Sequence, residues 1–431
     1  MAIVVKRGNS IFVEGPARIE IKEGTGIVFG REVYPGDTIV VKRAKAVGIA
    51  ALDRDLTVDI VSGVEPRYEI IEGSLFPDDW FHAADVISEL EKPAIVAVLG
   101  DVDTGKSTLV TFLANILFKR GFKVAIVDED VGQSDIGPPC VIGLSFMDRQ
   151  IFFLEELEFY DGYFVGSITP SGLLQRSIVG VRLLLDRALE EGAEVILINT
   201  TGWVYGRGAR ELKTLILRVL RVNCIIAIEK SRELEHLIAP FRRSGTLRIL
   251  RVTSPPRIRE RDRVDRKFLR ETSFEKYLRD AKEVKLKLDD VGIVYGFLGT
   301  GRPATPEELS LIEKIVGVKV EYAEISRDAV VVITAERVKV DALMVSALKL
   351  HFNCQDVRVV HYGDFKGTLV GLSSSDGRFL GLGIISQFNP KSRELTILTP
   401  VKAEDIAIIE YGCVKVSPEG KEERIFHPWS V

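Results

Sequence analysis

The sequence predicts a protein of the α/β class, with a central parallel sheet between two regions rich in β-strands. From Pro93 onward, continuous apolar strands alternate with amphipathic helices, which is typical of a parallel sheet covered on both faces. A glycine-rich turn at residues 100–108 stands between a predicted strand and a predicted helix. Before residue 73 and after residue 283, short strand patterns dominate instead. The three regions together predict more than one domain.

Residues 1–85 are predicted to form an N-terminal β domain. Short runs such as "IFVEGPARIEI" and "GDTIVVKRAKAVGIAAL" alternate apolar and polar residues between glycine-rich turns. This pattern favours an all-β sandwich or barrel, and we expect the sandwich-like form. Within residues 73–92, the helix-like run "ADVISELEK" is expected to connect this domain to the next one.

Residues 86–282 are predicted to form the central domain, and residues 283–431 a C-terminal β-rich domain. Central strands are indicated by "AIVAVLG", "KVAIVDED", "EVILINTTG" and "NCIIAIE", each followed or preceded by a helical pattern. The C-terminal region reads as strands, with helices expected near residues 305–315 and 341–350.

The composition is that of a globular protein. The chain has 431 residues, of which 46% are hydrophobic and 28% charged, and its net charge is −4. No apolar run approaches the roughly 20 residues that span a bilayer, and the N-terminus lacks the pattern of a signal peptide. We therefore expect a soluble, cytoplasmic protein with no membrane contact. Five Gln, six Asn and three Met against 120 charged residues (58 basic and 62 acidic) resemble the composition of thermophile proteins.

Cysteine and histidine spacing predicts no disulfide framework and no zinc site. The four cysteines lie far apart, and no CxxC occurs. The five histidines show neither HxH nor HExxH spacing. Chemistry must therefore be sought in other residues.

The glycine-rich turn matches the complete phosphate-binding loop motif, G-x4-G-K-S, and is called the P-loop below. Its backbone amides and the following helix N-terminus can cradle phosphate oxygens. Lys106 is expected to reach the β- and γ-phosphates of ATP, and Ser107 to hold Mg²⁺. A chance match or a retired nucleotide site is the alternative. The predicted ATP-binding residues of the loop are Gly100, Asp101, Val102, Asp103, Thr104, Gly105, Lys106, Ser107 and Thr108.

Two carboxylates follow in the strand "KVAIVDEDVGQSD". Asp128 and Asp130 are two residues apart, so on an extended segment both would face the same way. Ligands lie at the carboxyl ends of such strands, which would bring both carboxylates near the γ-phosphate. One can hold Mg²⁺ together with Ser107, directly or through water, and the other can accept a proton from an attacking hydroxyl. A polar turn at the end of the strand is the alternative.

A tryptophan and an arginine-rich segment suggest a nucleic-acid substrate. Trp203 follows a predicted strand between glycines, where a nucleobase could stack on it; a ring that packs its own loop is the alternative. Between Arg242 and Arg270 there are eleven Lys or Arg and three Asp or Glu. Arginines there could clamp a phosphoryl group or bind a polynucleotide backbone, or form a solvated helix face. Because no NKxD motif follows, ATP is favoured over GTP.

The order of these motifs resembles a known family. The P-loop, "DEDVGQSD", "GSITPSG" (residues 166–172), "INTTGWVYGRGARELK" and an arginine-rich lid (about residues 254–280) are similar to the polynucleotide 5′-hydroxyl kinases of RNA processing. These include the messenger-RNA cleavage-factor kinase subunit, tRNA-splicing and nucleolar kinases, and archaeal homologues. The resemblance is strong over residues 93–280, weaker in "EGTGIVFGREV", and architectural in the C-terminal domain. Two departures are Asp101-Val102 in the P-loop and a tyrosine missing from "GARELK".

The resemblance assigns further roles. It implies that Asp130 orients or deprotonates the RNA 5′-hydroxyl, that Arg261 and Arg266 are the catalytic lid arginines beside Lys106, and that Glu14 accepts a hydrogen bond from adenine. Neighbouring arginines leave the lid register open by a few positions. The residues implied for the RNA end and for the clasp that closes over Lys106 are Gln133, Thr169, Thr201, Gly202 and Trp203.

We therefore expect an ATP- and Mg²⁺-dependent kinase that phosphorylates the 5′-hydroxyl of single-stranded RNA ends, with DNA as an alternative acceptor. RNA-processing proteins are the expected protein partners. Two other hypotheses stay open: a catalytically silent, ATP-bound scaffold subunit, and a regulatory ATPase without an RNA substrate.

Overall fold

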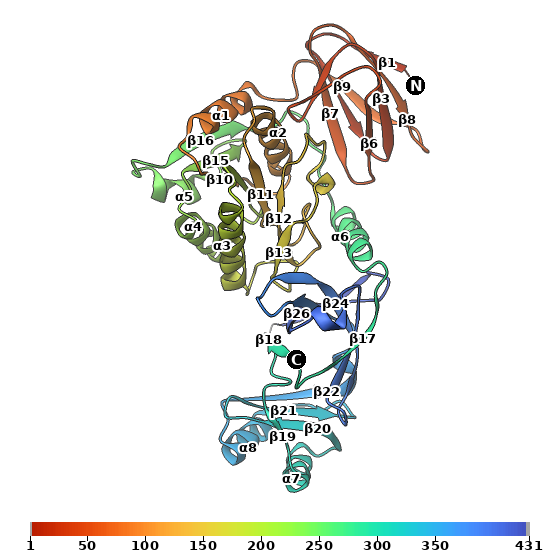
Figure 1. Ribbon diagram of the computed structural model, residues 1–431, viewed down its shortest axis with the longest axis vertical. Helices are drawn as coiled ribbons and strands as arrows, with labels where there is room; N and C mark the ends of the chain where they lie inside the picture. The colour runs from red at the N-terminus through yellow and green to blue at the C-terminus, as the bar shows by residue number, and fades with distance from the viewer. Residues whose placement is uncertain (1, 428–431) are drawn as a thin grey trace. The chain divides into compact units, whose positions relative to one another are not determined.

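The computed structural model describes residues 2–427, and the chain divides into two compact units (Figure 1). The first comprises the chain up to Gly137 with Val141–Tyr163 and Thr169–Leu269; the second comprises Pro138–Cys140, Phe164–Ile168 and the chain from Arg270 onward. The border between Leu269 and Arg270 lies inside helix α6 (Arg263–Tyr277). The predicted division into three domains at residues 85 and 282 stays a prediction.

Residues 2–71 form two antiparallel sheets, as the alternating patterns predicted. In β3 (Ala17–Glu23) the buried and more exposed residues alternate along most of the strand, because one face covers the core. Side chains from both sheets, among them Ile19 and Ile49, belong to one hydrophobic core. The first sheet has the order β1 (Ala2–Val5), β8 (Leu56–Val61), β3, β6 (Thr38–Val41), and the second β5 (Arg31–Val33), β4 (Gly26–Val28), β7 (Ala46–Ala51), β2 (Ser10–Glu14), β9 (Arg67–Ile71).

The predicted connector contains helix α1 (Asp78–Glu89), which joins the N-terminal sheets to the central sheet. Trp80 on α1 is fully buried, and its ring lies 5.4 Å from that of Phe112 on α2 (Lys106–Lys119). Its indole Nε1 donates a hydrogen bond to the Thr253 carbonyl at 2.9 Å. One continuous core therefore runs from the N-terminal strands to the helix that follows the P-loop.

The central sheet has seven strands, and one prediction about it was wrong. Strands β10, β11, β14, β15 and β16 run parallel, but β12 pairs antiparallel with β11. No helix lies between β11 and β12, and a parallel return is usually made through a crossover helix. The sheet is thus mixed rather than parallel. Its order is β13 (Asp161–Phe164), β12 (Val141–Phe146), β11 (Val124–Asp128), β14 (Val195–Asn199), β10 (Ala94–Leu99), β15 (Cys224–Glu229), β16 (Arg248–Thr253).

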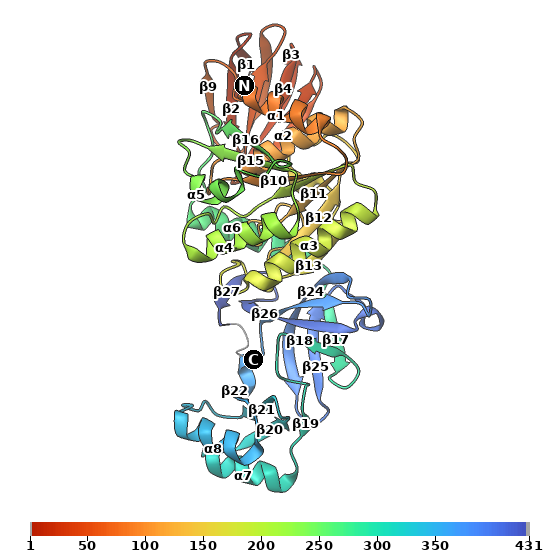
Figure 2. The same cartoon turned by 90° about the vertical axis from the view of Figure 1, so that its left-hand side faces the viewer.

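Helices cover this sheet, and the lid follows its last strand, β16 (Figure 2). Besides α2, they are α3 (Leu174–Glu190), α4 (Arg207–Val219) and the short α5 (Glu235–Ile238). After β16, residues 254–262 form neither helix nor strand, and α6 follows. The predicted lid is therefore an extended segment plus one helix.

The second unit contains two further sheets and the two predicted helices. Helix α7 (Pro306–Val316) starts at Thr305, whose hydroxyl accepts a hydrogen bond from the Glu308 amide, and it ends at Gly317 with a φ of +79°. Helix α8 covers Ala342–Phe352. One sheet has the order β17 (Lys282–Lys287), β25 (Glu394–Thr399), β24 (Phe379–Asn389), β23 (Thr368–Ser373), β26 (Ile408–Val416), β18 (Gly292–Val294), with β27 (Glu422–Ile425) on β26; the other is β19 (Arg302–Pro303), β20 (Val320–Ile325), β21 (Ala329–Thr334), β22 (Asp356–His361).

Within residues 2–427, none of the helices combines the length and the apolar character needed to cross a bilayer.

Candidate active site

The P-loop connects the end of β10 to the start of α2, as predicted. Gly105 has a φ of +94°, and Asp103 has a φ of +53°. A Cβ at Gly105 would lie only 3.1 Å from the Pro255 ring of the lid, so a larger residue would be both strained and crowded. The Asp101 carbonyl accepts hydrogen bonds from Thr104 Oγ1 at 2.8 Å and from Lys106 Nζ at 2.5 Å. The loop is thus curled around one of its own carbonyls.

Lys106 is buried at the base of this loop. Burial and, to a smaller extent, the positive charge of Lys213 lower the pKa of its ammonium, which is about 8 after the opposing effect of nearby carboxylates. Asp130 is the carboxylate that opposes this pKa shift most, followed by Asp101 and Asp103. The lysine thus lies in a site where an additional negative group, such as a phosphate, would favour its protonated form.

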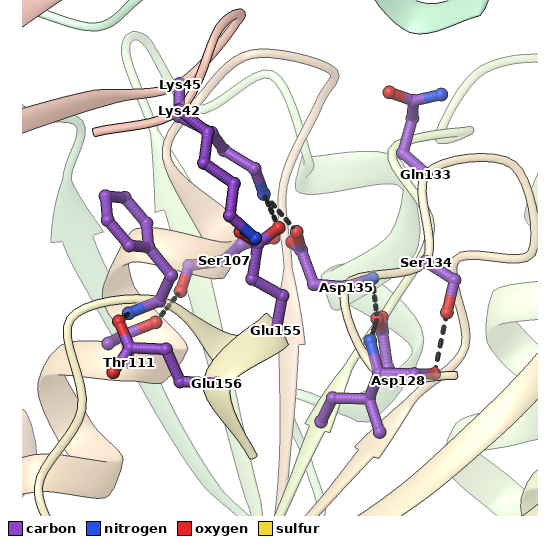
Figure 3. A network of polar contacts seen from close by, with 12 residues as sticks. Lys42, Lys45, Ser107, Thr111, Asp128, Gln133, Ser134, Asp135, Glu155 and Glu156 are labelled. Carbon is purple, nitrogen blue, oxygen red and sulfur yellow. Dashed lines mark hydrogen bonds and ion pairs between the residues drawn. The ribbon is translucent and has the colours of Figure 1, made fainter. Parts of the chain in front are cut away.

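Asp128 ends strand β11 and holds the following turn in place. Its Oδ2 accepts hydrogen bonds from the amides of Asp135 at 2.7 Å and Ile136 at 3.2 Å (Figure 3). Its Oδ1 accepts one from Asn199 Nδ2 at 3.0 Å. Burial, and then the charges of Asp135 and Asp130, raise the pKa of Asp128 well above its usual value.

Asp130 lies beyond the strand, so the alternation argument for a pair with Asp128 does not apply. Because β11 ends at Asp128, residues 129–130 already belong to a loop. The Asp130 Oδ1 accepts hydrogen bonds from the amides of Gly132 at 3.2 Å and Gln133 at 3.1 Å. This turn, rather than strand periodicity, orients the carboxylate.

The lid arginines and the P-loop meet at Asp103. Arg266 Nη2 lies 2.8 Å from Asp103 Oδ2, and the Arg261 amide donates to the same oxygen at 3.4 Å. Gln133 Nε2 donates to the Arg266 carbonyl at 3.3 Å. Four of the predicted residues are therefore joined by direct hydrogen bonds or ion pairs.

Glu14 contacts the lid through a different arginine. It ends strand β2, and its Oε2 lies 2.8 Å from Arg259 Nη1. Arg259 also pairs with Asp265 at 2.8 Å, and Arg257 Nη2 lies 3.6 Å from Glu14 Oε1. The predicted adenine acceptor is thus paired with lid arginines.

The predicted clasp residue Gly202 lies against the P-loop. A Cβ at Gly202 would lie 3.0 Å from the backbone N and Cα of Val102, so only glycine fits there without displacing the loop. The Trp203 ring packs on Gly208 at the start of α4, as the alternative hypothesis for this residue proposed, but the side chain stays partly exposed. The Thr169 hydroxyl accepts a hydrogen bond from the Ser171 amide at 3.3 Å, and its approach to Lys106 stays a prediction.

The sequence arguments missed a buried ion pair below the clasp. Glu129 and Lys213 have fully buried side chains, and Glu129 Oε2 lies 2.8 Å from Lys213 Nζ. The same oxygen accepts a hydrogen bond from the Thr201 amide at 2.7 Å. One signal was present: with Ala209, Leu212 and Ile216, Lys213 occupies the apolar stripe of α4, where a charge needs a partner.

Tyr205 was also missed, although it is the most exposed aromatic residue of the clasp loop. The residue is 52% exposed, and its ring stacks on that of His236, with centroids 5.8 Å apart and planes 16° apart. Burial, followed by the charge of Asp101 in the P-loop, raises the pKa of the Tyr205 phenol. An aromatic surface is thus held next to the phosphate cradle.

The oxygen groups near Ser107 are suited to Mg²⁺. The Ser107 Oγ accepts a hydrogen bond from Asn199 Nδ2 at 3.3 Å. The Asn199 Oδ1 is buried and has no hydrogen-bond partner within the described residues. No group of three or more His, Cys, Asp or Glu suited to a metal occurs in the described part of the chain. Mg²⁺, which keeps several waters and shares substrate phosphates, fits such a site better than a metal that needs a full protein cage.

Comparison with known proteins identifies a family model and relatives that this chain resembles. Residues 100–280 match the family model for the P-loop of the mRNA cleavage and polyadenylation factor CLP1. The polyribonucleotide 5′-hydroxyl-kinase of Pyrococcus furiosus is 36% identical over 350 residues, which cover 80% of this chain and 94% of the relative. The chain belongs to this kinase family. The relative from Methanocaldococcus jannaschii is 33% identical over 352 residues, covering 80% of this chain and 93% of that one.

A solved structure extends the likeness to the whole fold of the family. The structure of wild-type Clp1p in complex with Pcf11p matches with a TM-score of 0.64 over 96% of this chain and 97% of that chain. The sequence identity is 13%, so this match concerns the fold alone.

Proposed function

We propose that this protein is an ATP-dependent kinase that transfers the γ-phosphate of ATP to the 5′-hydroxyl end of RNA. The observation that carries the proposal is the linkage of the P-loop, the Asp130 turn and the lid through Asp103, Gln133 and Arg266. Its relatives at 33–36% identity carry the name of this activity. DNA as a second acceptor belongs to the same proposal.

The reaction is an in-line displacement at the γ-phosphorus. The ribose 5′-oxygen forms the new P–O bond while the bond to the ADP oxygen breaks, and Asp130 receives the proton of the hydroxyl. Lys106, Arg261 and Arg266 stabilise the charge on the transferring group. For this, Arg266 must exchange its contact with Asp103 for a phosphate oxygen.

Mg²⁺ would be held by Ser107, with Asp128 and Asp130 acting through water. When bound, the ion neutralises charge on the β- and γ-phosphates. Asp128 contributes mainly by fixing the turn, since four hydrogen-bond donors already occupy its carboxylate.

The terminal nucleotide is proposed to stack on Trp203, within reach of Gln133, Thr169 and Thr201, and adenine to contact Glu14. Glu14 would first have to leave Arg259. RNA-processing proteins are the proposed partners. We also propose three working domains, residues 1–85 with a sandwich-like fold, 86–282 and 283–431.

Phosphoryl transfer from γ-labelled ATP to a 5′-hydroxyl oligoribonucleotide tests the proposal. Wild-type protein with Mg²⁺ should label the RNA, whereas Asp130→Ala should bind ATP normally and transfer at least about a hundredfold more slowly. Asp262→Ala, which removes an exposed lid carboxylate, is the matched control and should transfer normally. Tight retention of ATP without labelled RNA would indicate a catalytically silent scaffold subunit. Release of free phosphate without labelled RNA would indicate a regulatory ATPase.

A further inference from the structure

An exposed aromatic ring with a second ring behind it lies on the clasp loop, two residues after Trp203. Tyr205 is 52% exposed, and its ring stacks on that of His236, with the centroids 5.8 Å apart. His236 Nε2 lies 2.7 Å from the Val204 carbonyl oxygen, so the supporting ring is held to the same loop. His236 belongs to α5, which lies beside α4 (Figure 1, Figure 2). One face of a fixed aromatic ring is thus open to a ligand.

The stability of the fold does not account for this exposed ring. An aromatic side chain contributes most to folding when its large surface is buried, and Tyr205 leaves about half of its surface in water. Val204 anchors the loop instead, since it is only 1% exposed. The feature to explain is therefore why a ring that is supported from behind is left uncovered in front.

The two aromatic residues of this loop are spaced for two separate bases. Burial alternates along the segment, since Trp203 is partly exposed, Val204 buried and Tyr205 exposed. This alternation is that of an extended segment, in which residues two apart face the same way. Such residues lie roughly 6.6 Å apart, about twice the 3.4 Å between neighbouring phosphates along a stacked strand. Two bases that have come apart from each other could therefore each stack on a ring of their own.

Positive charge lies next to the exposed ring. Arg207 and Arg210, in the first turn of α4, are both exposed. Neither forms an ion pair within residues 2–427, although Arg210 Nη2 donates to the His236 carbonyl at 3.4 Å. Guanidinium groups without a carboxylate partner are available to the phosphates of a nucleic acid. An aromatic platform beside such groups is the combination with which proteins bind single strands.

We propose that Tyr205 is a second stacking site, which holds the base next to the terminal base of the RNA, with Arg207 beside the RNA backbone. The inference rests on the proposed function, in which Trp203 holds the terminal base. It makes the site selective for ends that carry at least two bases. It gives little selectivity among the four bases, since each of them has an aromatic face.

Equilibrium binding tests this site in the full chain, with a non-hydrolysable ATP analogue present. Three 5′-hydroxyl ligands are compared: a dinucleotide with a 3′-phosphate, the same dinucleotide with an abasic second residue, and a nucleoside 3′-phosphate. Wild-type protein should bind the complete dinucleotide about tenfold more tightly than the abasic one, as expected for one stacked base. Tyr205→Leu should reduce this difference to less than about twofold and leave the affinity for the nucleoside 3′-phosphate unchanged. Tyr205→Phe should keep the difference, because the aromatic face remains.

Tyr34→Leu is the matched control, because Tyr34 in the N-terminal sheets is 51% exposed and takes no part in the proposed site. It should keep the wild-type difference between the two dinucleotides. Arg207→Ala should weaken both dinucleotides by the same factor and make their binding less sensitive to salt.

Equal affinities of wild-type protein for the two dinucleotides would overturn the inference, as would a Tyr205→Leu variant that retains the difference. A Tyr205→Leu variant that also loses affinity for the nucleoside 3′-phosphate would overturn it too, since the ring would then hold the terminal base. No phosphoryl transfer is measured in this experiment. A wild-type protein that shows the expected binding pattern but labels no RNA would therefore sink the proposed function and leave this stacking site standing.

Discussion

At the residue scale, Lys106 shows how burial changes the chemistry of a motif. The P-loop motif requires a lysine that binds the phosphates of the nucleotide. The fold buries this lysine, and its pKa falls from the usual 10.5 to about 8. The free protein therefore loses this positive charge as the pH rises through about 8, whereas a bound triphosphate favours the protonated form.

ATP affinity should accordingly fall about tenfold between pH 7 and pH 9, because the protonated fraction of a group with a pKa near 8 falls by that factor. Binding near pH 8 should also take up a proton, which calorimetry in buffers of different ionisation enthalpy can measure. Lys106→Met, which cannot titrate, is the control and should lose this pH dependence. An affinity that is flat over the same range in wild type would contradict the assignment.

Two aromatic residues of the clasp loop, Trp203 and Tyr205, are candidates for stacking on the terminal nucleobase of the RNA. Trp203 packs on Gly208, while the more exposed Tyr205 stacks on His236. If Trp203 holds the terminal base, Trp203→Ala should raise the KM for RNA roughly tenfold, as expected from about 1–3 kcal/mol per stacked base, with little change in the KM for ATP. Tyr205→Ala is the comparison. A larger KM increase in Tyr205→Ala would transfer the stacking role to that ring.

At the element scale, the lid is held on the P-loop by a contact that must change during the reaction. Arg266 and the Arg261 amide both engage Asp103, a P-loop residue. Arg266→Ala should therefore lower kcat about a hundredfold or more through lost stabilisation of the transferring phosphate. Arg263→Ala is the matched control, since it removes an equal charge from an exposed position of the same helix. Equal rates for the two variants would remove Arg266 from the mechanism.

The Glu129–Lys213 pair links the loop after β11, helix α4 and the clasp. Lys213→Met leaves the Glu129 carboxylate buried without its counter-ion, which should cost about 3 kcal/mol in the free energy of unfolding. Urea unfolding measures that loss. The double variant Glu129→Gln/Lys213→Met should recover most of it, because the amide carbonyl can still accept from Thr201. A double variant as unstable as Lys213→Met would show that packing, and not the unpaired charge, sets the cost.

At the scale of the whole molecule, the composition predicts high thermal stability. Few Gln, Asn and Met residues accompany abundant charges, and many of these charges form ion pairs in the structure, such as Arg270 with Glu422 at 2.7 Å. We expect a midpoint of thermal unfolding above about 80 °C by scanning calorimetry. A midpoint in the ordinary mesophilic range would show that these pairs add little.

Much of this protein was readable from local sequence, because the relevant signals are short-range. The P-loop needs one strand, one turn and one helix that are adjacent in the chain, and glycines at positions 100 and 105 mark it without any tertiary information. The all-β start, four strands of the central sheet (β10, β11, β14 and β15) and the helices α7 and α8 follow in the same way from the periods of apolar residues. The antiparallel strand β12 was missed because strand direction depends on whether the connection contains a crossover helix, and not on the strand's own residues.

Tertiary structure alone decided which charges meet. Arg266 and Asp103 are 163 residues apart in the chain, so no local pattern pairs them. The sequence by itself determined the kind of chemistry, since backbone curvature and side-chain type are local properties. Folding determined the partners, and with them the pKa of Lys106 and the occupied carboxylate of Asp128, because burial and electrostatic contact exist only between segments that pack together.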